Sequence, residues 1–282
     1  MKGLLHRLLR LATMAALVWA GLVAALWFKQ EWLIFRPHTL PADWVFDKGP
    51  DVHERWIEVP NGEGGRLNAL HLKLPRPDGV VYFLHGNGGS LEGWFVNLDI
   101  YRRANLDLFM IDYRGYGKSP CCITSEAQLH ADVRAAWQAV AADYAGRGDG
   151  FTRVFYGRSM GTGLAAVLAA EVQPELTILA SPYLGMAALA DEHYPWVPKA
   201  VLRYPLSTAE ALPRVKTPVL MLHGTDDRLI DVSHARRLKA LRPASTLVEV
   251  AGARHDDVAR IPAYREAVAA ALQQALARQR PR

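Results

Sequence analysis

Short apolar runs alternate with amphipathic stretches along most of the chain. Apolar runs typical of buried strands occupy residues 80–84, 108–111, 153–156, 176–180, 219–222 and 246–250. Helical patterns separate them at 91–102, 125–142, 160–171, 233–241 and 262–277. Apolar strands that alternate with helices predict an α/β fold, with a mostly parallel sheet covered by helices on both faces. Such sheets carry their functional sites at the carboxyl ends of the strands.

Two other segments depart from this alternation. Residues 55–59 and 67–74 alternate apolar and polar side chains around Asn61-Gly62 and Gly64-Gly65, which predicts a hairpin at the edge of the sheet. Residues 183–213 contain four prolines and have no clear place in the strand–helix order. We expect this segment to be a short lid inserted over the site.

The amino terminus carries a long uncharged stretch at residues 11–28, preceded by Lys2, Arg7 and Arg10. Its length suits a helix that crosses a bilayer, and the preceding charges predict that the amino-terminal ten residues stay cytoplasmic. A cleaved signal peptide is the alternative, with residues 23–25 as a small-residue cleavage site. We therefore expect residues 1–29 to be an anchor or signal peptide, 30–50 a connector that packs on the domain, and 51–282 the catalytic domain.

The formal net charge of +5 is unevenly distributed along the chain. Residues 1–36 carry +4 and residues 278–282 carry +3, so the body between them sums to −2. This distribution predicts no nucleic-acid partner. The two cysteines, Cys121 and Cys122, are neighbours; because a bridge between neighbours closes a small strained ring, we expect no disulfide framework.

Candidate chemistry begins after the run at 153–156, where residues 157–161 read Gly-Arg-Ser-Met-Gly. A G-x-S-x-G motif between a strand and a helix places the serine on a strained turn, and side chains at 157 or 161 would collide with the neighbouring strand and helix. We therefore predict that Ser159 is a nucleophile.

A serine hydroxyl needs a base and an acid that orients the base. Asp226 and Asp227 follow the run at 219–222, and His255 follows the run at 246–250, in the chain order serine, acid, histidine. Either aspartate fits this position. Oxyanion donors are expected at the N–H of Met160 and at the N–H of Asn87, or else of Gly88, in the Gly-rich loop after residue 84.

With these motifs in place, the chain from about residue 30 onward resembles a membrane-anchored group of α/β-hydrolases related to serine aminopeptidases, lysophospholipases and protein depalmitoylases. The resemblance rests on the motifs at residues 31–37, 85–89, 112–119, 157–161, 223–227 and 252–255. It implies Asp227 as the acid, because the family uses the fifth residue of the His-Gly-Thr motif, and it matches Tyr183 to an aromatic residue beside the site. Cys121-Cys122 and Arg254 depart from the family pattern.

These features together predict a serine hydrolase that cleaves a carboxylic ester, a lysophospholipid or a thioester through an acyl-enzyme, with no metal or cofactor. The expected partners are a small acyl substrate and the membrane. Tyr183, Met186 and Trp196 are the expected substrate-binding residues, with Tyr194, Val197 and Leu202 as further apolar candidates in the lid. The alternatives are a serine peptidase, an acyltransferase with the same residues, and a non-catalytic binding protein on this fold. We expect a single-pass cell-membrane protein with its catalytic domain on the non-cytoplasmic side.

Overall fold

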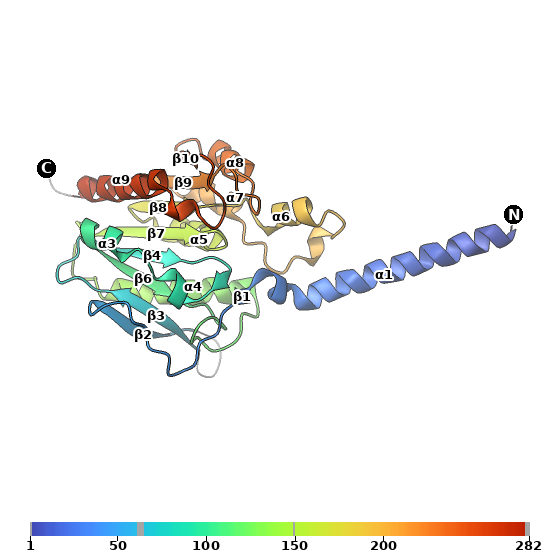
Figure 1. The fold of residues 1–282 in the computed structure, drawn as a ribbon, viewed down its shortest axis with the longest axis horizontal. Helices are drawn as coiled ribbons and strands as arrows, with labels where there is room; N and C mark the ends of the chain where they lie inside the picture. Colours follow the sequence, from blue (N-terminus) through green and yellow to red (C-terminus); the bar gives the residue numbers. More distant parts are fainter. Residues whose placement is uncertain (1, 61–64, 149, 280–282) are drawn as a thin grey trace.

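The computed structural model describes residues 2–60, 65–148 and 150–279. Within these residues, one central sheet has eight strands in the order β10-β9-β8-β7-β4-β6-β3-β2 (Figure 1). Their bounds are β2 Val52–Glu58, β3 Arg66–Leu72, β4 Gly79–Leu84, β6 Leu106–Ile111, β7 Thr152–Arg158, β8 Leu176–Ala180, β9 Val219–Gly224 and β10 Thr246–Val250. Six neighbouring strands are parallel to one another: β10, β9, β8, β7, β4 and β6. Strand β3 runs antiparallel to both β2 and β6. The predicted α/β architecture with a mostly parallel sheet is confirmed.

Helices cover both faces of this sheet. One face packs against α4 (Glu126–Ala142), α5 (Gly161–Val172) and α8 (Ser233–Leu241), and the other against α2 (Leu91–Trp94), α3 (Leu98–Ala104) and α9 (Pro262–Gln279). Ser125 caps α4, because its side chain accepts a hydrogen bond from the Gln128 N–H at 3.1 Å.

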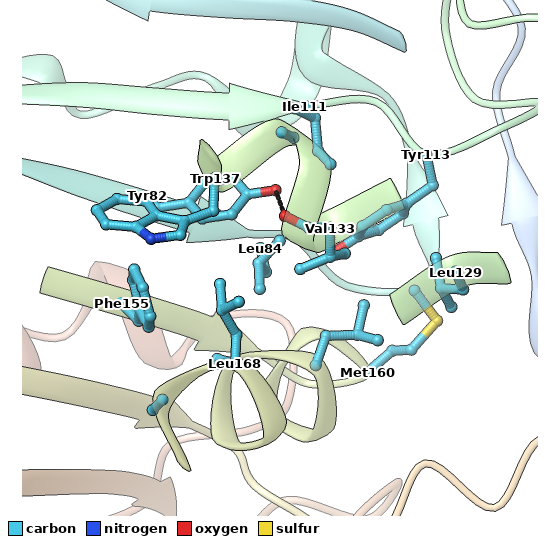
Figure 2. Close-up of a cluster of buried hydrophobic side chains, with 14 of the residues drawn as sticks. Tyr82, Leu84, Ile111, Tyr113, Leu129, Val133, Trp137, Phe155, Met160 and Leu168 are labelled. Atoms are coloured by element: carbon cyan, nitrogen blue, oxygen red, sulfur yellow. Dashed lines mark hydrogen bonds between the residues drawn. The ribbon is translucent and has the colours of Figure 1, made fainter. Parts of the chain in front are cut away.

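Aromatic side chains fill the core between α4, α5 and the sheet. Tyr82 on β4 stacks against Trp137 on α4, and Trp137 meets Phe155 on β7 edge-on (Figure 2). The Tyr82 hydroxyl donates to the Val133 carbonyl at 3.3 Å, so this buried polar group is satisfied. The cluster also includes Met160, which follows the serine of the predicted elbow, so the core directly supports the turn that carries Ser159.

The segment predicted to be a lid contains α6 (Met186–His193), the 3-10 helix η1 (Lys199–Val201) and α7 (Thr208–Ala211), and the 3-10 helix η2 (Leu212–Arg214) follows at its end. We call residues 183–213 the cap. None of the residues of α6 is buried, and this short helix was not predicted from the pattern. A further 3-10 helix, η3 (Val258–Arg260), precedes α9.

The amino-terminal helix α1 (Lys2–Ile34) projects away from the body (Figure 1). It is long and apolar enough to cross a membrane, and none of its most apolar window is buried. The helix bends at Lys29, where the backbone leaves helical geometry, and then continues through residues that were expected to begin the connector. Beyond it, β1 (Arg36–Pro37) pairs with β5 (Gly88–Gly89), which places the end of α1 beside the Gly-rich loop.

The structure corrects two local expectations. The helix expected at 91–102 is divided into α2 and α3, because Asn97 adopts a left-handed conformation at the start of α3. In the connector, which was expected to pack on the domain, Phe35 is buried but Trp32 is 68% exposed, with the Arg36 guanidinium over its ring. Cys121 and Cys122 are joined in a disulfide, but this bridge between neighbours ties no distant segments together and is not a disulfide framework.

The hairpin formed by β2 and β3 is confirmed at the edge of the sheet. Three of the four turn residues used to predict it, Asn61, Gly62 and Gly64, lie outside the described residues.

Candidate active site

Ser159 lies on the sharp turn between β7 and α5. Its φ is +52°, a left-handed conformation that is strained for a residue with a side chain, and its N–H donates to the Ala180 carbonyl at 2.8 Å. A Cβ at Gly157 would collide with the backbone of Gly161, and a Cβ at Gly161 would collide with the carbonyl of Leu84. Both glycines are therefore required by close packing around the turn.

Three predicted side chains from separate loops meet at this turn. The Ser159 hydroxyl lies 3.0 Å from Nε2 of His255 and can donate its proton to it. On the other side of the imidazole, Nδ1–H of His255 donates to Oδ2 of Asp227 at 2.7 Å. Asp226, the other candidate acid, is exposed and accepts a hydrogen bond from the Thr225 hydroxyl instead. The structure therefore places Asp227, and not Asp226, behind the histidine.

The carboxylate of Asp227 is held in its charged form. Burial by itself would raise the pKa of Asp227, but hydrogen bonds from His223, His255 and the Ile230 N–H outweigh burial and hold this pKa well below its usual range. Oδ1 accepts from the N–H groups of Leu229 and Ile230 at 3.0 and 2.9 Å, which leaves Oδ2 for His255. A fixed anion in this position orients the imidazole and stabilises its protonated form.

Arg158 contacts the loop that carries His255, a role that was not predicted from the sequence pattern. Its side chain is buried and donates a hydrogen bond to the backbone carbonyl of His255. The sequence does contain one indication of this role: Arg158 is a charged residue directly before Ser159, at the end of a strand whose preceding residues are mostly apolar. Arg158 therefore links the strand that carries the serine to the loop that carries the base.

The two expected oxyanion donors are free to bind a ligand. Within the described parts of the chain, the backbone N–H groups of Met160 and Asn87 have no hydrogen-bond partner. Both residues line the cavity in front of Ser159. The Tyr183 hydroxyl donates to the Met160 carbonyl at 3.1 Å, and the Asn87 side-chain amide donates to the Ile34 carbonyl at 3.1 Å. These bonds fix both peptide units, and fixed donors are what oxyanion stabilisation requires.

A buried pair supports the Gly-rich loop. His85 is fully buried, and its Nε2 lies 3.6 Å from Oδ1 of Asp112. Burial lowers the pKa of His85 to about 4. Burial also raises the pKa of Asp112 to about 8, although a hydrogen bond from the Leu91 N–H opposes this shift. The neutral forms of both groups are therefore favoured near neutral pH.

The cavity in front of Ser159 has a volume of about 500 Å³. The expected substrate-binding residues Tyr183 and Met186 line it. Trp196 lies elsewhere, at a second depression along α1. The lining also includes residues from the end of α1 that the sequence reasoning did not place at the site, namely Leu26, Gln30, Leu33 and Ile34. Within the described residues, no group of three or more His, Cys, Asp or Glu side chains is arranged to hold a metal ion.

Curated relatives identify the family. The human α/β hydrolase domain-containing protein 17B is 30% identical over 223 residues, which cover 77% of this chain and 74% of the human protein. An uncharacterised protein of Mycobacterium tuberculosis is 30% identical over 264 residues, 89% of each chain. This chain belongs to the α/β-hydrolase superfamily. A family model described as serine aminopeptidase, S33, also matches residues 75–211 of this hydrolase.

Solved structures agree on the fold. An esterase from Pyrococcus furiosus superimposes with a TM-score of 0.66 at 17% identity, covering 86% of this hydrolase and 98% of the esterase. A serine hydrolase without a lid from Xanthomonas campestris has a TM-score of 0.56 at 20% identity, covering 83% and 97% of the two chains. At such identities the likeness establishes the fold alone.

Proposed function

We propose that this α/β hydrolase is a serine hydrolase that cleaves a carboxylic ester, a lysophospholipid or a thioester through an acyl-enzyme. The observation that carries the proposal is the continuous contact from Asp227 through His255 to Ser159, at 2.7 and 3.0 Å, in front of an apolar cavity. This arrangement activates a serine hydroxyl.

The chemistry then proceeds in two steps. Oγ of Ser159 attacks the acyl carbonyl carbon while Nε2 of His255 accepts the hydroxyl proton, and the N–H groups of Met160 and Asn87 stabilise the oxyanion. Nε2 returns the proton to the leaving alcohol or thiol as the carbon–oxygen or carbon–sulfur bond breaks. A water molecule, deprotonated by the same nitrogen, attacks the acyl-enzyme; Nε2 then returns this proton to Oγ of Ser159 as the bond to the acyl group breaks and the acid is released.

The cavity favours acyl chains over peptides as substrates. Of the residues that line it, most are apolar, and those from the cap are mainly aliphatic or aromatic: Tyr183, Met186, Leu189, Ala190, Tyr194, Val197, Val201 and Leu202. A peptide substrate would need partners for its backbone N–H and C=O groups along such a wall. We therefore place Tyr183 and Met186 in the acyl-binding wall.

Fluorophosphonate labelling tests the serine nucleophile. The wild-type chain should be labelled at Ser159, and the S159A variant should not. An acyl-chain series of esters and lysophospholipids, compared with S-acyl thioesters and aminoacyl amides, then separates the substrate classes. If the wild type is unlabelled, or S159A is labelled equally, the assignment of Ser159 as the nucleophile fails, and an unlabelled wild type would favour a binding protein on this fold. Faster cleavage of amides than of esters would indicate a peptidase, and transfer to added alcohols in preference to water would indicate an acyltransferase.

We also propose that α1 anchors the protein in the cell membrane with the catalytic domain on the non-cytoplasmic side. The support is the apolar length of α1 together with the positive charges that precede it. A reporter fused after Arg282 should read as non-cytoplasmic. The mass of the mature amino terminus separates an intact anchor from cleavage near residue 25.

A further inference from the structure

The end of the apolar amino-terminal helix forms one wall of the catalytic cavity. Leu26, Leu33 and Ile34 of α1 line the same cavity as Ser159. Another part of the wall comes from the cap, including Val201 and residues of α6. The cavity therefore lies between the main body, the cap and a helix whose preceding turns are suited to a bilayer.

A second depression lies on α1, nearer the amino terminus. It is lined by residues of the apolar stretch, among them Val18, Trp19 and Leu22, together with Trp196 at the tip of the cap. Positions 15, 18, 22 and 26 all precede the bend at Lys29 and recur at spacings of three or four residues, so they lie on one face of the helix. This stripe runs from the middle of the apolar stretch to the cavity that contains Ser159.

The tip of the cap reaches the depth of lipid acyl chains. The indole N–H of Trp19 donates to the Trp196 carbonyl at 3.2 Å. Trp19 precedes Phe28, the last residue of the uncharged stretch, by nine positions, and at a rise of 1.5 Å per residue this is about 14 Å along the helix. When α1 spans a bilayer, Trp196 therefore lies beside hydrocarbon and not beside water.

Large apolar side chains are exposed around the tip, near the exposed ion pair of Lys199 and Asp191. Tyr194 and Trp196 are 50% and 45% exposed, and Leu229 beside them is 54% exposed. Clustered apolar exposure is unfavourable in water but matches a membrane surface, where tyrosine and tryptophan are enriched. The cavity lining also includes the polar residues Gln30, Arg36 and Asn87, and His193 on the cap.

We infer that the substrate is a long-chain acyl ester of a bilayer lipid, which enters sideways from the membrane along the groove between α1 and the cap. The carbonyl group would reach Ser159, while the alkyl chain would remain against Leu22 and Trp196. This inference rests on the proposed hydrolase function and names its substrate class.

Reconstituted vesicles test this route with the full-length chain. The substrates are a hexadecanoyl ester of 4-methylumbelliferone in the phosphatidylcholine bilayer and the soluble acetyl ester. L22W fills the groove, and L17W adds the same bulk on the opposite face of α1, where Leu17 is 67% exposed and lines neither depression. The ratio of hexadecanoyl to acetyl kcat/KM should fall at least tenfold in L22W and stay within twofold of wild type in L17W. An unchanged ratio in L22W, or an equal fall in both variants, would overturn the route.

A second measurement needs no variant. A phosphatidylcholine with a diazirine on its acyl chain is photolysed in vesicles that hold the wild-type protein. Cross-links should map to peptides that contain Leu22 and Trp196. Cross-links on α1 that are absent from the cap would contradict the inference.

The two proposals fail in different ways. If the wild type cleaves neither ester and is not labelled by fluorophosphonate, the hydrolase function itself fails. If the wild type cleaves the acetyl ester and is labelled, but L22W keeps the hexadecanoyl ratio, only the membrane route fails.

Discussion

The side-chain oxygen of Gln30 accepts a hydrogen bond from the backbone N–H of Arg203 at 2.8 Å. The amide nitrogen of Gln30 also donates to the Val201 carbonyl at 2.9 Å, so this side chain binds the cap backbone on both sides of Leu202. The next residue, Glu31, pairs with the Arg203 guanidinium. Because Gln30 is 5% exposed, the end of α1 and the cap share a buried polar contact.

Replacing Gln30 with leucine should loosen the attachment of the cap. Q30L keeps the volume of the side chain but leaves a buried N–H and a buried C=O without partners, which costs about 2 kcal/mol. We expect the free energy of unfolding in detergent to fall by about that amount. The control is T13V, because the Thr13 hydroxyl bonds only within α1, to the Leu9 carbonyl. Equal stability of Q30L and wild type would mean that the cap is held mainly by other contacts.

The neighbouring aspartates offer a matched pair for the catalytic proposal. D227N removes the anion that accepts the His255 N–H and should lower kcat by about 10³-fold or more, since the imidazole loses its orientation. D226N changes an exposed carboxylate one residue away and should keep kcat within about twofold. Ester hydrolysis by the two purified variants makes the comparison. A large loss in D226N with none in D227N would reverse the assignment.

Arg158 should act as a positioning residue for His255. R158M removes the hydrogen bond to the His255 carbonyl. It should lower kcat at least about tenfold while KM stays within twofold, because a small displacement of His255 from Ser159 slows proton transfer without changing the substrate cavity. R158K, which keeps one donor, should recover part of the lost activity. R153M is the control, since Arg153 on the same strand pairs with Glu175 at the surface. A change in KM alone would show that Arg158 affects substrate binding instead.

Asp112 should make the folded state less stable as the pH rises. Its pKa is raised to about 8 in the folded chain, above the ordinary value of 3.8, so the folded state holds a proton that the unfolded state loses between these values. The stability contribution therefore falls with increasing pH across this window, by at most about 1.4 kcal/mol per pH unit. Buried His71 and His85, whose pKa values are lowered to about 3 and 4, oppose this trend only below about pH 6.5.

Urea unfolding of wild type and D112N between pH 6.5 and 8 isolates the effect of Asp112. The wild type should lose stability relative to D112N as the pH rises, because asparagine carries no proton to release. Parallel pH profiles for the two proteins would show that Asp112 is already ionised in the folded chain.

Much of the fold can be read from local pattern. Apolar runs of strand length, separated by amphipathic segments, predict the parallel part of the sheet, and the structure confirms the strands at Leu176–Ala180 and Thr246–Val250 and the helix at Ser233–Leu241 to the residue. The motif around Ser159 is also local: a Cβ at Gly157 would collide with Gly161 and Thr162 in the same strand–turn–helix unit, although the need for Gly161 comes from the neighbouring strand, at Leu84. Chain order and strand ends alone also predict that His255 comes near Ser159.

The tertiary structure decides the contacts between distant segments. Asp226 and Asp227 cannot be separated by local pattern, since only the path of the loop toward His255 turns one carboxylate inward and leaves the other in solvent. The contact between Gln30 and Arg203 joins residues 173 positions apart. Hydrophobic periodicity shows that α1 has an apolar face but not what that face meets. Packing of the cap against α1 is what makes the end of this apolar helix part of the cavity in front of Ser159.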